Sequence, residues 1–335
     1  MSLLDKYLTP EVEQQLKGLT TSHGVTLDDI IRSGRENPES SIGVYAGDAE
    51  AYTLFAPLFD PIIEDYHQHS LKEVHPRDFD PAHLSVTNLD PSGERIRSTR
   101  IRVGRNAAAY AFPPAISKED RLELTQKVVA ALESLEGDLA GTYYPLEGMD
   151  KATQDQLIAD HFLFKEGDKY LESAGINRDW PEGRGIFHSA DKKFLVWVNE
   201  EDGLRIISME MGADLESIFD RLSRAASAIQ EKIPFAYDEH RGYLTSCPTN
   251  LGTGLRASYM AALPKLSQQP DFKETCKSLG LQARGIHGEH SESEGGMFDI
   301  SPTQRLGLTE VEAVQKLHDG MKKLFELEDE LAEAA

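Results

Sequence analysis

Three long stretches of the chain carry apolar residues at the spacing of a helix. The first follows Ser117 and Asp120, which can cap a helix, and its apolar face comprises Leu124, Val128, Ala131, Leu132 and Leu135. The second stripe comprises Leu215, Ile218, Leu222, Ala225, Ile229 and Ile233. The third follows a capping-box pattern and comprises Val314, Leu317, Met321 and Leu324, with Thr309 and Glu312 as the capping pair. We expect three amphipathic helices whose stripes pack into a core.

Strand-like runs alternate with these helices. The run FLVWV (194–198) is followed by NEEDG and then by LRIISM, which is typical of a β-hairpin with a turn ending in Asp-Gly. Glu201 would then lie in the turn and Arg205 near the start of the returning strand. Polar residues at the rim of a sheet more often face solvent than form a functional site. The residues around Glu201 and Arg205 therefore determine which interpretation applies.

The first 80 residues are mostly helical in pattern, with SSIGVYAGDAEAY as a loop that enters a helix. The segment PAHLSVTNLDPSG (81–93) has turn chemistry and no helical period, which favours a linker. We therefore expect a helical domain over 1–83, a linker over 84–94 and a larger domain over 95–335.

Composition narrows the class of protein. The chain has 335 residues, two cysteines and a net charge of −22. No run of eighteen apolar residues and no basic-then-apolar start occur, so we expect neither a membrane span nor a secretory signal, and we place the protein in the cytoplasm. So acidic a background disfavours nucleic acid as a partner, and any anion site must be built locally from a few basic groups.

Arginines recur inside short, otherwise uncharged motifs: STRIRVGR (98–105), LRII (204–207), CPTNLGTGLR (247–256) and ARG (283–285). Arg100 and Arg102 are two apart on an expected strand, so both point to one face. Like charges side by side repel unless an anion lies between them, and the guanidinium fork suits phosphate oxygens. Each arginine could instead pair with one of the 57 acidic residues.

Cys247 begins the motif CPTNLGTGLR, and the residues that flank it in sequence are poor neighbours for a core. Burial alone explains most free cysteines, but Thr249 could donate a hydrogen bond to a thiolate here, and a thiolate would be stabilised beside a cation. Cys276, in FKETCKSLG before Gly280, is typical of an ordinary helix cysteine.

Together these motifs resemble those of the phosphagen (guanidino) kinases, and most closely the arginine kinases among them. The resemblance covers nearly the whole chain and rests on STRIRVGR, DHFLFKEGD (160–168), WVNEEDGLRIISM, CPTNLGTGLRAS, RGIHGEH (284–290) and EGGMFDIS. It implies an α+β fold: a small all-helical N-terminal domain and a C-terminal antiparallel β-sheet flanked by helices, as in glutamine-synthetase-like catalytic domains.

The resemblance also implies the reaction. The γ-phosphoryl group of ATP would pass reversibly to the guanidinium of L-arginine, giving phosphoarginine and ADP. Mg²⁺ would be bound through the nucleotide phosphates, without a metal site built from protein side chains. Most members of this type are monomers, and we expect one here.

Site residues carried over from the resemblance fall into three groups. Those expected at the nucleotide are Ser98, Thr99, Arg100, Ile101, Arg102, His161, Arg205, Arg256, Ala257, Ser258, Tyr259, Met260, Arg284, Gly285, Ile286, His287 and Gly288. Those expected at the acceptor are Ser40, Ser41, Ile42, Gly43, Val44, Tyr45, Glu201, Cys247 and Glu289. The catalytic residues would be Glu201 and Glu289, which align the guanidinium, with Cys247 against it.

Four positions depart from the pattern of the family. Met260 stands where a nucleotide-contacting histidine is usual, and His287 where a phosphate-contacting arginine is frequent. Lys169 replaces a typical arginine, and Ser41 a typical glycine. The first two changes bear on nucleotide affinity, and none removes the chemistry.

Three further readings stay open. A protein-arginine kinase shares the C-terminal domain type but lacks the N-terminal helices, against which the ESSIGVYAGDAEAY loop argues. Another guanidino acceptor, such as taurocyamine, is compatible with the same motifs. A catalytically inactive relative would be expected to have lost a glutamate or an arginine of the set, and all are present.

The glycine-rich segment 285–296 is expected to order only when both substrates bind. Glu39 and Lys169 could form a weak latch between the two domains.

Overall fold

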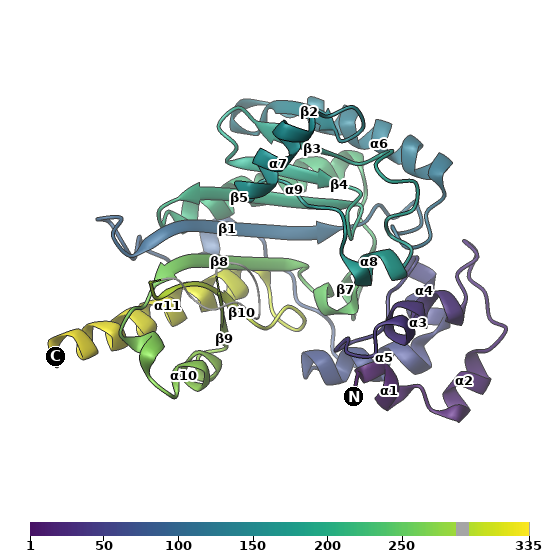
Figure 1. The fold of residues 1–335 in the computed structure, drawn as a ribbon, viewed down its shortest axis with the longest axis horizontal. Helices are drawn as coiled ribbons and strands as arrows, with labels where there is room; N and C mark the ends of the chain where they lie inside the picture. Colours follow the sequence, from purple (N-terminus) through teal and green to yellow (C-terminus); the bar gives the residue numbers. More distant parts are fainter. Residues whose placement is uncertain (286–294, 335) are drawn as a thin grey trace.

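The computed structural model describes residues 1–285 and 295–334. Five helices gather at one end of the molecule, where the chain begins, while the C-terminal helix ends at the far side (Figure 1). These N-terminal helices are α1 (Leu3–Tyr7), α2 (Pro10–Leu16), α3 (Leu27–Glu36), α4 (Ala49–Leu54) and α5 (Ala56–His67). Side-chain caps begin four of them, from Ser2, Thr9, Thr26 and Asp48.

The rest of the chain is built on an eight-stranded sheet in the order β2-β3-β4-β5-β1-β8-β10-β9. Every neighbouring pair in it is antiparallel. The strands are β1 (Ile96–Arg105), β2 (Gly141–Pro145), β3 (Gly185–Ser189), β4 (Phe194–Val198), β5 (Leu204–Met211), β8 (Leu255–Ala262), β9 (Leu281–Arg284) and β10 (Met297–Pro302). A separate short hairpin joins β6 (Tyr237–Asp238) to β7 (Gly242–Tyr243).

Helices flank this sheet (Figure 1). They are α6 (Lys118–Glu133), α7 (Lys151–Ala159), α8 (Lys169–Ser173), α9 (Leu215–Lys232), α10 (Phe272–Ser278) and α11 (Glu310–Glu333). Short 3-10 helices η1 (Pro81–His83), η2 (Gly137–Leu139), η3 (Pro248–Asn250) and η4 (Leu266–Gln268) lie in the connections. Together these elements confirm the expected α+β class, with N-terminal helices and an antiparallel sheet.

The two faces of the sheet differ in character because side chains alternate along each strand. On β1, Ile101 and Val103 are fully buried and belong to the main core, to which α6, α9 and α11 contribute their apolar stripes. Arg100 and Arg102 point to the opposite face. A smaller apolar cluster that includes Leu195 and Trp197 covers part of that face. The central strand therefore has one side in the core and one side available for a charged site.

The elements expected from apolar patterns are confirmed. The stripes beginning at Leu124, Leu215 and Val314 lie on α6, α9 and α11, and the capping box between Thr309 and Glu312 is formed. Strands β4 and β5 pair as the expected hairpin. Cys276 is buried on α10, as expected for an ordinary helix cysteine.

The segment expected to be a linker contains only η1 as regular structure, and it runs along α11. The amide of Ser85 donates to Gln315, and that of Thr87 to His318. The N-terminal helices share a buried core with residues from the C-terminal part, among them Phe112 and Leu244. The exact domain boundaries remain a prediction. None of the described helices is both long and apolar enough to cross a bilayer.

Candidate active site

Strand register brings the arginine motifs together on the open face of the sheet. Arg102 on β1 is paired with Arg256 on β8, and Gly104 on the other side of β1 is paired with Arg205 on β5. On the next strands Asp299 is paired with Arg284. Motifs separated by about half the chain thus converge, because three adjacent antiparallel strands carry them.

These arginines repel one another. Burial lowers the pKa of Arg100 to about 10, with Arg205 and Arg256 contributing in the same direction. Burial, followed by Arg205, Arg305 and Arg256, lowers the pKa of Arg102 well below its usual range. The guanidinium groups of Arg100 and Arg205 both lie over the ring of Trp197, at 5.4 and 5.3 Å from its centroid. A concentration of buried cations of this kind favours binding of a polyanion.

Two arginines of this cluster lie close to a carboxylate. Arg256 forms an ion pair with Asp299, with Nη2 to Oδ1 at 2.9 Å. Arg205 lies 4.0 Å from Glu200. The alternative that each arginine simply pairs with an acid therefore holds for Arg256 and, at longer range, for Arg205. Among the described residues, Arg102 donates to two neutral acceptors, the carbonyl of Gly254 at 2.9 Å and Asn250 Oδ1 at 3.3 Å.

Glu201 lies in the β4–β5 turn, as expected. Burial raises its pKa to about 7, with the neighbouring carboxylates of Asp202 and Glu200 acting in the same direction and Arg205 and Arg102 opposing them. Asn250 donates a hydrogen bond from Nδ2 to Oε1 of Glu201 at 3.0 Å. A carboxylate held here at the edge of the arginine cluster is placed to receive a cation.

Asp202 fixes the turn against the segment that carries the thiol. Its Oδ1 accepts from the amide of Ser246 at 2.7 Å and from Nδ2 of Asn106 at 2.8 Å. Asn106 in turn accepts from the amide of Gly203 through Oδ1 at 2.7 Å. These buried bonds hold Glu201 and Cys247, the neighbours of Asp202 and Ser246 in sequence, in one constellation.

Cys247 is buried, and its Sγ lies 3.1 Å from Oγ1 of Thr249, the contact expected from the sequence. Burial and the nearby Glu201 raise the pKa of Cys247, while Thr249 lowers it. The neutral thiol is therefore favoured in this site as it stands. The expected thiolate would need the charge of a bound guanidinium beside it.

The N-terminal loop over 40–45 reaches the same place. Tyr45 is buried, and its pKa is raised by burial and by Cys247 and Glu201. The amide of Ala46 donates to the carbonyl of Ser246 at 2.7 Å. Of the loop residues expected at the acceptor, Ile42, Gly43, Val44 and Tyr45 are buried, Ser41 is exposed and Ser40 is half-buried.

The other residues expected at the nucleotide divide between the two faces of β1 and β8. Register places Ser98 opposite Met260 and Arg100 opposite Ser258, on the face that bears the cluster. The other four residues point their side chains into the core on the opposite face: Thr99, Ile101, Ala257 and Tyr259. Only the backbone atoms of these residues could contact the nucleotide. His161 is exposed after α7, in a segment tied down by the hydrogen bond from Trp197 Nε1 to the carbonyl of Phe162.

Four expected site residues lie outside the described part of the chain: Ile286, His287, Gly288 and Glu289. Gly285, which precedes them, is buried, and Arg284 is half-buried. A cavity of about 470 Å³ beside this edge is lined by Arg284, Arg305, Tyr66 and His67 among others. The second expected carboxylate thus remains a prediction.

Sequence reasoning missed several residues that organise this site. Asn250 lies within the CPTNLGTGLR motif, in which the sequence assigns roles to Cys247, Thr249 and Arg256 but none to the asparagine. Asp202 is the third acid of NEEDG, and only the middle acid was assigned. Arg305 donates to Asn250 Oδ1 at 2.6 Å, but nothing in its own sequence context, SPTQRLGL, marks it.

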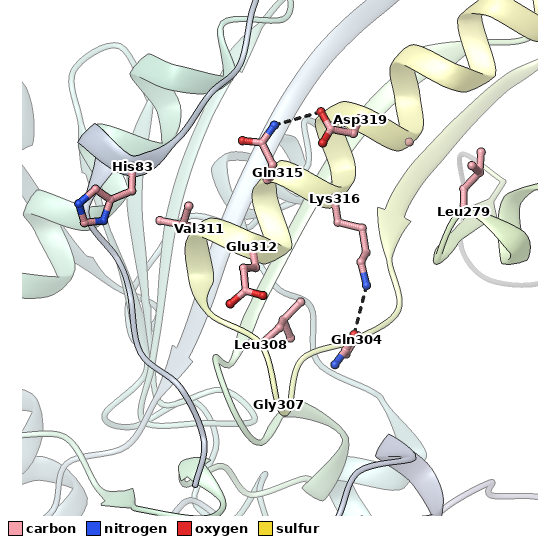
Figure 2. A pocket seen from close by; sticks show the side chains of 11 residues that line it. His83, Leu279, Gln304, Gly307, Leu308, Val311, Glu312, Gln315, Lys316 and Asp319 are labelled. Carbon is pink, nitrogen blue, oxygen red and sulfur yellow. Dashed lines mark hydrogen bonds between the residues drawn. The ribbon is translucent and has the colours of Figure 1, made fainter. Parts of the chain in front are cut away.

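In the described residues a metal-ligand cluster is absent, and a further cavity lies outside this constellation. Within residues 1–285 and 295–334, no three His, Cys, Asp or Glu side chains form a group suited to a metal ion. A second cavity of about 580 Å³ runs along α11 and is lined by Leu308, Val311, Gln315 and Lys316, among others (Figure 2). Four of its polar side chains bond in pairs, Lys316 to Gln304 and Gln315 to Asp319, and no residue of its lining belongs to the constellation described above.

Known protein families match most of this chain. Two family models match: the N-terminal domain of ATP:guanido phosphotransferase over residues 1–64, and its C-terminal catalytic domain over 123–331. An arginine kinase of Anthopleura japonica is 57% identical over 98% of this chain, which spans only 46% of that relative. An arginine kinase of Penaeus japonicus is 53% identical over 98% of this chain and 94% of its own length.

Solved structures of similar fold include two kinases named for other guanidino acceptors. A lombricine kinase superposes with a TM-score of 0.95 at 39% identity, covering 99% of this chain and 93% of its own. The duplicated taurocyamine kinase of Schistosoma mansoni, with bound transition-state analogue components, gives a TM-score of 0.93 at 44% identity, over 98% of this chain and 46% of its own. Both domain models and these relatives agree, and the chain belongs to the ATP:guanido phosphotransferase family.

Proposed function

We propose that this protein is a kinase for free L-arginine, which transfers the γ-phosphoryl group of MgATP reversibly to the guanidinium group. The observation that carries the proposal is the constellation of Glu201, Cys247 and Tyr45 at the edge of a buried arginine cluster. One side of this constellation suits a guanidinium cation, and the other suits a chain of phosphates.

The nucleotide phosphates would be held by Arg100, Arg102, Arg205, Arg256 and Arg284. Transfer of a phosphoryl group asks little covalent work of a protein, so neutralisation of charge and in-line positioning supply most of the rate. The repulsion among these guanidinium groups is relieved when the polyanion enters. Mg²⁺ would arrive bound to phosphates and water, and it would supply further neutralisation there.

The acceptor would be aligned by Glu201 on one side and by Glu289, outside the described residues, on the other. A guanidinium loses its proton only above about pH 12, whereas burial raises the pKa of Glu201 to about 7 before a cation binds, so the gap is at least roughly 5 units. Full deprotonation before attack would cost at least about 7 kcal/mol. The proton therefore leaves during or after formation of the P–N bond, and we assign alignment as the main role of the carboxylate.

Arginine, rather than a smaller acceptor, is supported by the N-terminal loop. Tyr45 is buried beside Cys247 and Glu201, where its hydroxyl could bind the α-amino group of an amino acid. Creatine has no such group and would leave polar groups of the site unpaired. The relatives of highest identity named above are arginine kinases, whereas the taurocyamine and lombricine kinases are less similar.

A coupled assay that follows ADP release tests the proposal. MgATP would be offered with arginine, creatine, taurocyamine, lombricine, glycocyamine or a folded protein as the acceptor. We expect arginine to give the highest kcat/KM by a wide margin. A higher value for taurocyamine or for the protein substrate would replace the proposed acceptor, and absence of turnover with every acceptor would remove the proposed activity.

We further propose that the enzyme acts as a monomer in the cytoplasm, without nucleic acid or membrane partners. The helical part over 1–83, the linker over 84–94 and the catalytic part over 95–335 would be its functional units. Glu39 of the helical part forms an ion pair with Lys169 of the catalytic part. The family usually has an arginine at the position of this lysine. Because both side chains are exposed, water screens the pair and its contribution to stability is small.

A further inference from the structure

Two arginines meet at a cavity on the core side of β1, away from the catalytic cluster. Arg105, at the end of β1, and Arg77, in the segment before η1, both lie over the ring of Tyr243. Their guanidinium carbons are 3.5 and 5.7 Å from its centroid, respectively. The cavity has a volume of about 430 Å³, and α9 supplies its other wall with Ser223, Ser227 and Gln230.

Neither arginine has a carboxylate within 4.0 Å in the part of the chain that the structure describes. Arg105 is 1% exposed, and its Nη1 donates to the carbonyls of Gly104 and Thr253. Its Nε is buried without a hydrogen-bond partner. A buried guanidinium with an unsatisfied donor is costly, which calls for an acceptor.

The charged groups around the cavity do not neutralise Arg77 and Arg105. The electrostatic influence of Glu310 reaches both arginines, but this carboxylate is buried and already accepts from the amide of Asp78. Glu231 lines the cavity but is exposed to solvent. His75 lies near both arginines and is kept neutral by burial. The arginines repel each other, and an anion between them would relieve the repulsion.

We propose that this cavity binds a phosphate group, either as free phosphate or as the end of a small phosphomonoester. Arg77 and Arg105 would supply the charge. The hydroxyl of Ser227 and the amide of Gln230 offer further donors from α9. The hydroxyl of Tyr243 accepts a hydrogen bond from Nη2 of Arg77 at 3.3 Å, which holds that guanidinium at the cavity. The combination of guanidinium groups with hydroxyl and amide donors matches tetrahedral oxyanions better than a single carboxylate.

The site is connected to the catalytic cluster through one turn. Arg105 donates to the carbonyl of Thr253, and Arg102 donates to the carbonyl of the next residue, Gly254. Consecutive carbonyls of this turn are thus held from opposite faces of β1. An anion that draws Arg105 toward the cavity would act on the turn that also supports Arg102.

Location is tested by soaking phosphate-free crystals of the full chain in selenate, whose selenium gives an anomalous signal. We expect a peak between Arg77 and Arg105, separate from any peak at the catalytic arginines. Peaks at the catalytic arginines alone would overturn the proposal.

Affinity is tested by calorimetric titration with inorganic phosphate and, separately, with glycerol phosphate, in the presence of MgADP to occupy the catalytic arginines. We expect a Kd of about 1 mM or tighter for at least one of the two anions. Arg77→Gln should weaken that binding by about tenfold or more. Arg97→Gln removes an exposed arginine of β1 that does not line the cavity, and it should leave the binding unchanged.

Equal affinities in wild type and both variants, or no binding at millimolar concentrations, would mean that the two arginines are only structural. Because Arg77 is exposed, its replacement should leave the fold intact, and a thermal melt without anions checks this. The test does not depend on which guanidino acceptor is used. A failure here is therefore distinguishable from failure of the proposed kinase activity.

Discussion

Asn250 donates from Nδ2 to Oε1 of Glu201 at 3.0 Å, while its Oδ1 accepts from Arg305 at 2.6 Å and from Arg102 at 3.3 Å. One buried amide thus joins the carboxylate expected at the acceptor to an arginine expected at the phosphates. Because Oδ1 faces two guanidinium groups, Nδ2 must face Glu201. The amide therefore sets the orientation of that carboxylate.

Replacing this amide should weaken catalysis more than substrate binding. Asn250→Ala removes the donor to Glu201 and one acceptor each of Arg102 and Arg305, which keep only their bonds to the carbonyls of Gly254 and Thr249 in the described part of the chain. We expect kcat to fall by up to about 100-fold because the reacting groups lose alignment. Steady-state kinetics with MgATP and arginine provide the measurement, and a change confined to the KM for ATP would contradict the assigned role.

The charge of Glu201 should matter more than its shape. Glu201→Gln keeps the acceptor and the size but removes the charge that opposes the guanidinium, so kcat should fall by about 100-fold or more. The affinity for MgADP, measured by calorimetry, should change little. Glu216→Gln, an exposed acid at the start of α9, is the matched control and should behave as wild type. Near wild-type turnover of Glu201→Gln would remove this residue from the mechanism.

Activity should rise with pH through the titration of Glu201. Burial and the adjacent Asp202 raise its pKa to about 7, so the protonated form, which cannot attract the guanidinium, is populated below neutral pH. At saturating MgATP, kcat/KM for arginine reports the form of the enzyme that awaits the acceptor and should increase between about pH 6 and pH 8. A flat profile over this range would show that the carboxylate is ionised throughout.

The free energy of unfolding should fall as the pH rises through the titration of Glu201, whereas activity should rise. A carboxyl whose pKa is raised in the folded state binds more protons there than in the unfolded state, so stability is lost as pH rises from about 4.5 toward 7. Glu201→Gln removes this loss. Denaturant titrations at pH 8 should therefore find Glu201→Gln more stable than wild type, in exchange for its lost activity. Equal or lower stability of the variant would argue against an energetically unfavourable carboxylate.

Buried histidines should make the protein sensitive to acid. Burial lowers the pKa of His75 to about 4 from the usual 6.5, and its Nδ1 accepts from the amide of Gly307. The unfolded chain gains this proton first, so the stability is fully present above about pH 6.5 and declines as the pH falls toward 4.

Between pH 7.5 and 5.5, His75 alone should account for about 1 kcal/mol of that decline. His75→Gln retains an acceptor for Gly307 but does not titrate. The difference between wild type and variant in urea-unfolding free energy should therefore shrink as the pH is lowered. A difference that stays constant with pH would exclude His75 as the titrating group.

Much of the fold follows from local pattern. The apolar stripe that begins at Leu215 places one face of α9 in the core, and the Asp-Gly turn after FLVWV places Glu201 at the end of a hairpin. Alternation along β1 places Arg100 and Arg102 on one face. These predictions succeed because helical period, turn chemistry and strand alternation are properties of a few neighbouring residues.

The remainder depends on contacts between distant segments. Arg305 lies 55 residues from Asn250, and Asn106 lies 96 residues from Asp202, so no short motif reveals either bond. The ion pair of Arg256 with Asp299 likewise depends on the neighbouring positions of β8 and β10 in the sheet. Strand order decides these partners, and the sequence pattern does not specify it.

Direct observation of the product by ³¹P NMR tests the central claim. Wild-type protein, MgATP and arginine would be incubated together, and the spectrum followed for the resonance of a phosphorus bonded to a guanidino nitrogen. We expect this resonance to grow at the expense of the γ-phosphate of ATP, to reverse when MgADP is added in excess, and to be nearly absent with Glu201→Gln. Release of inorganic phosphate without any P–N resonance, or an equal yield from Glu201→Gln, would contradict the assignment of this constellation as the site of transfer to arginine.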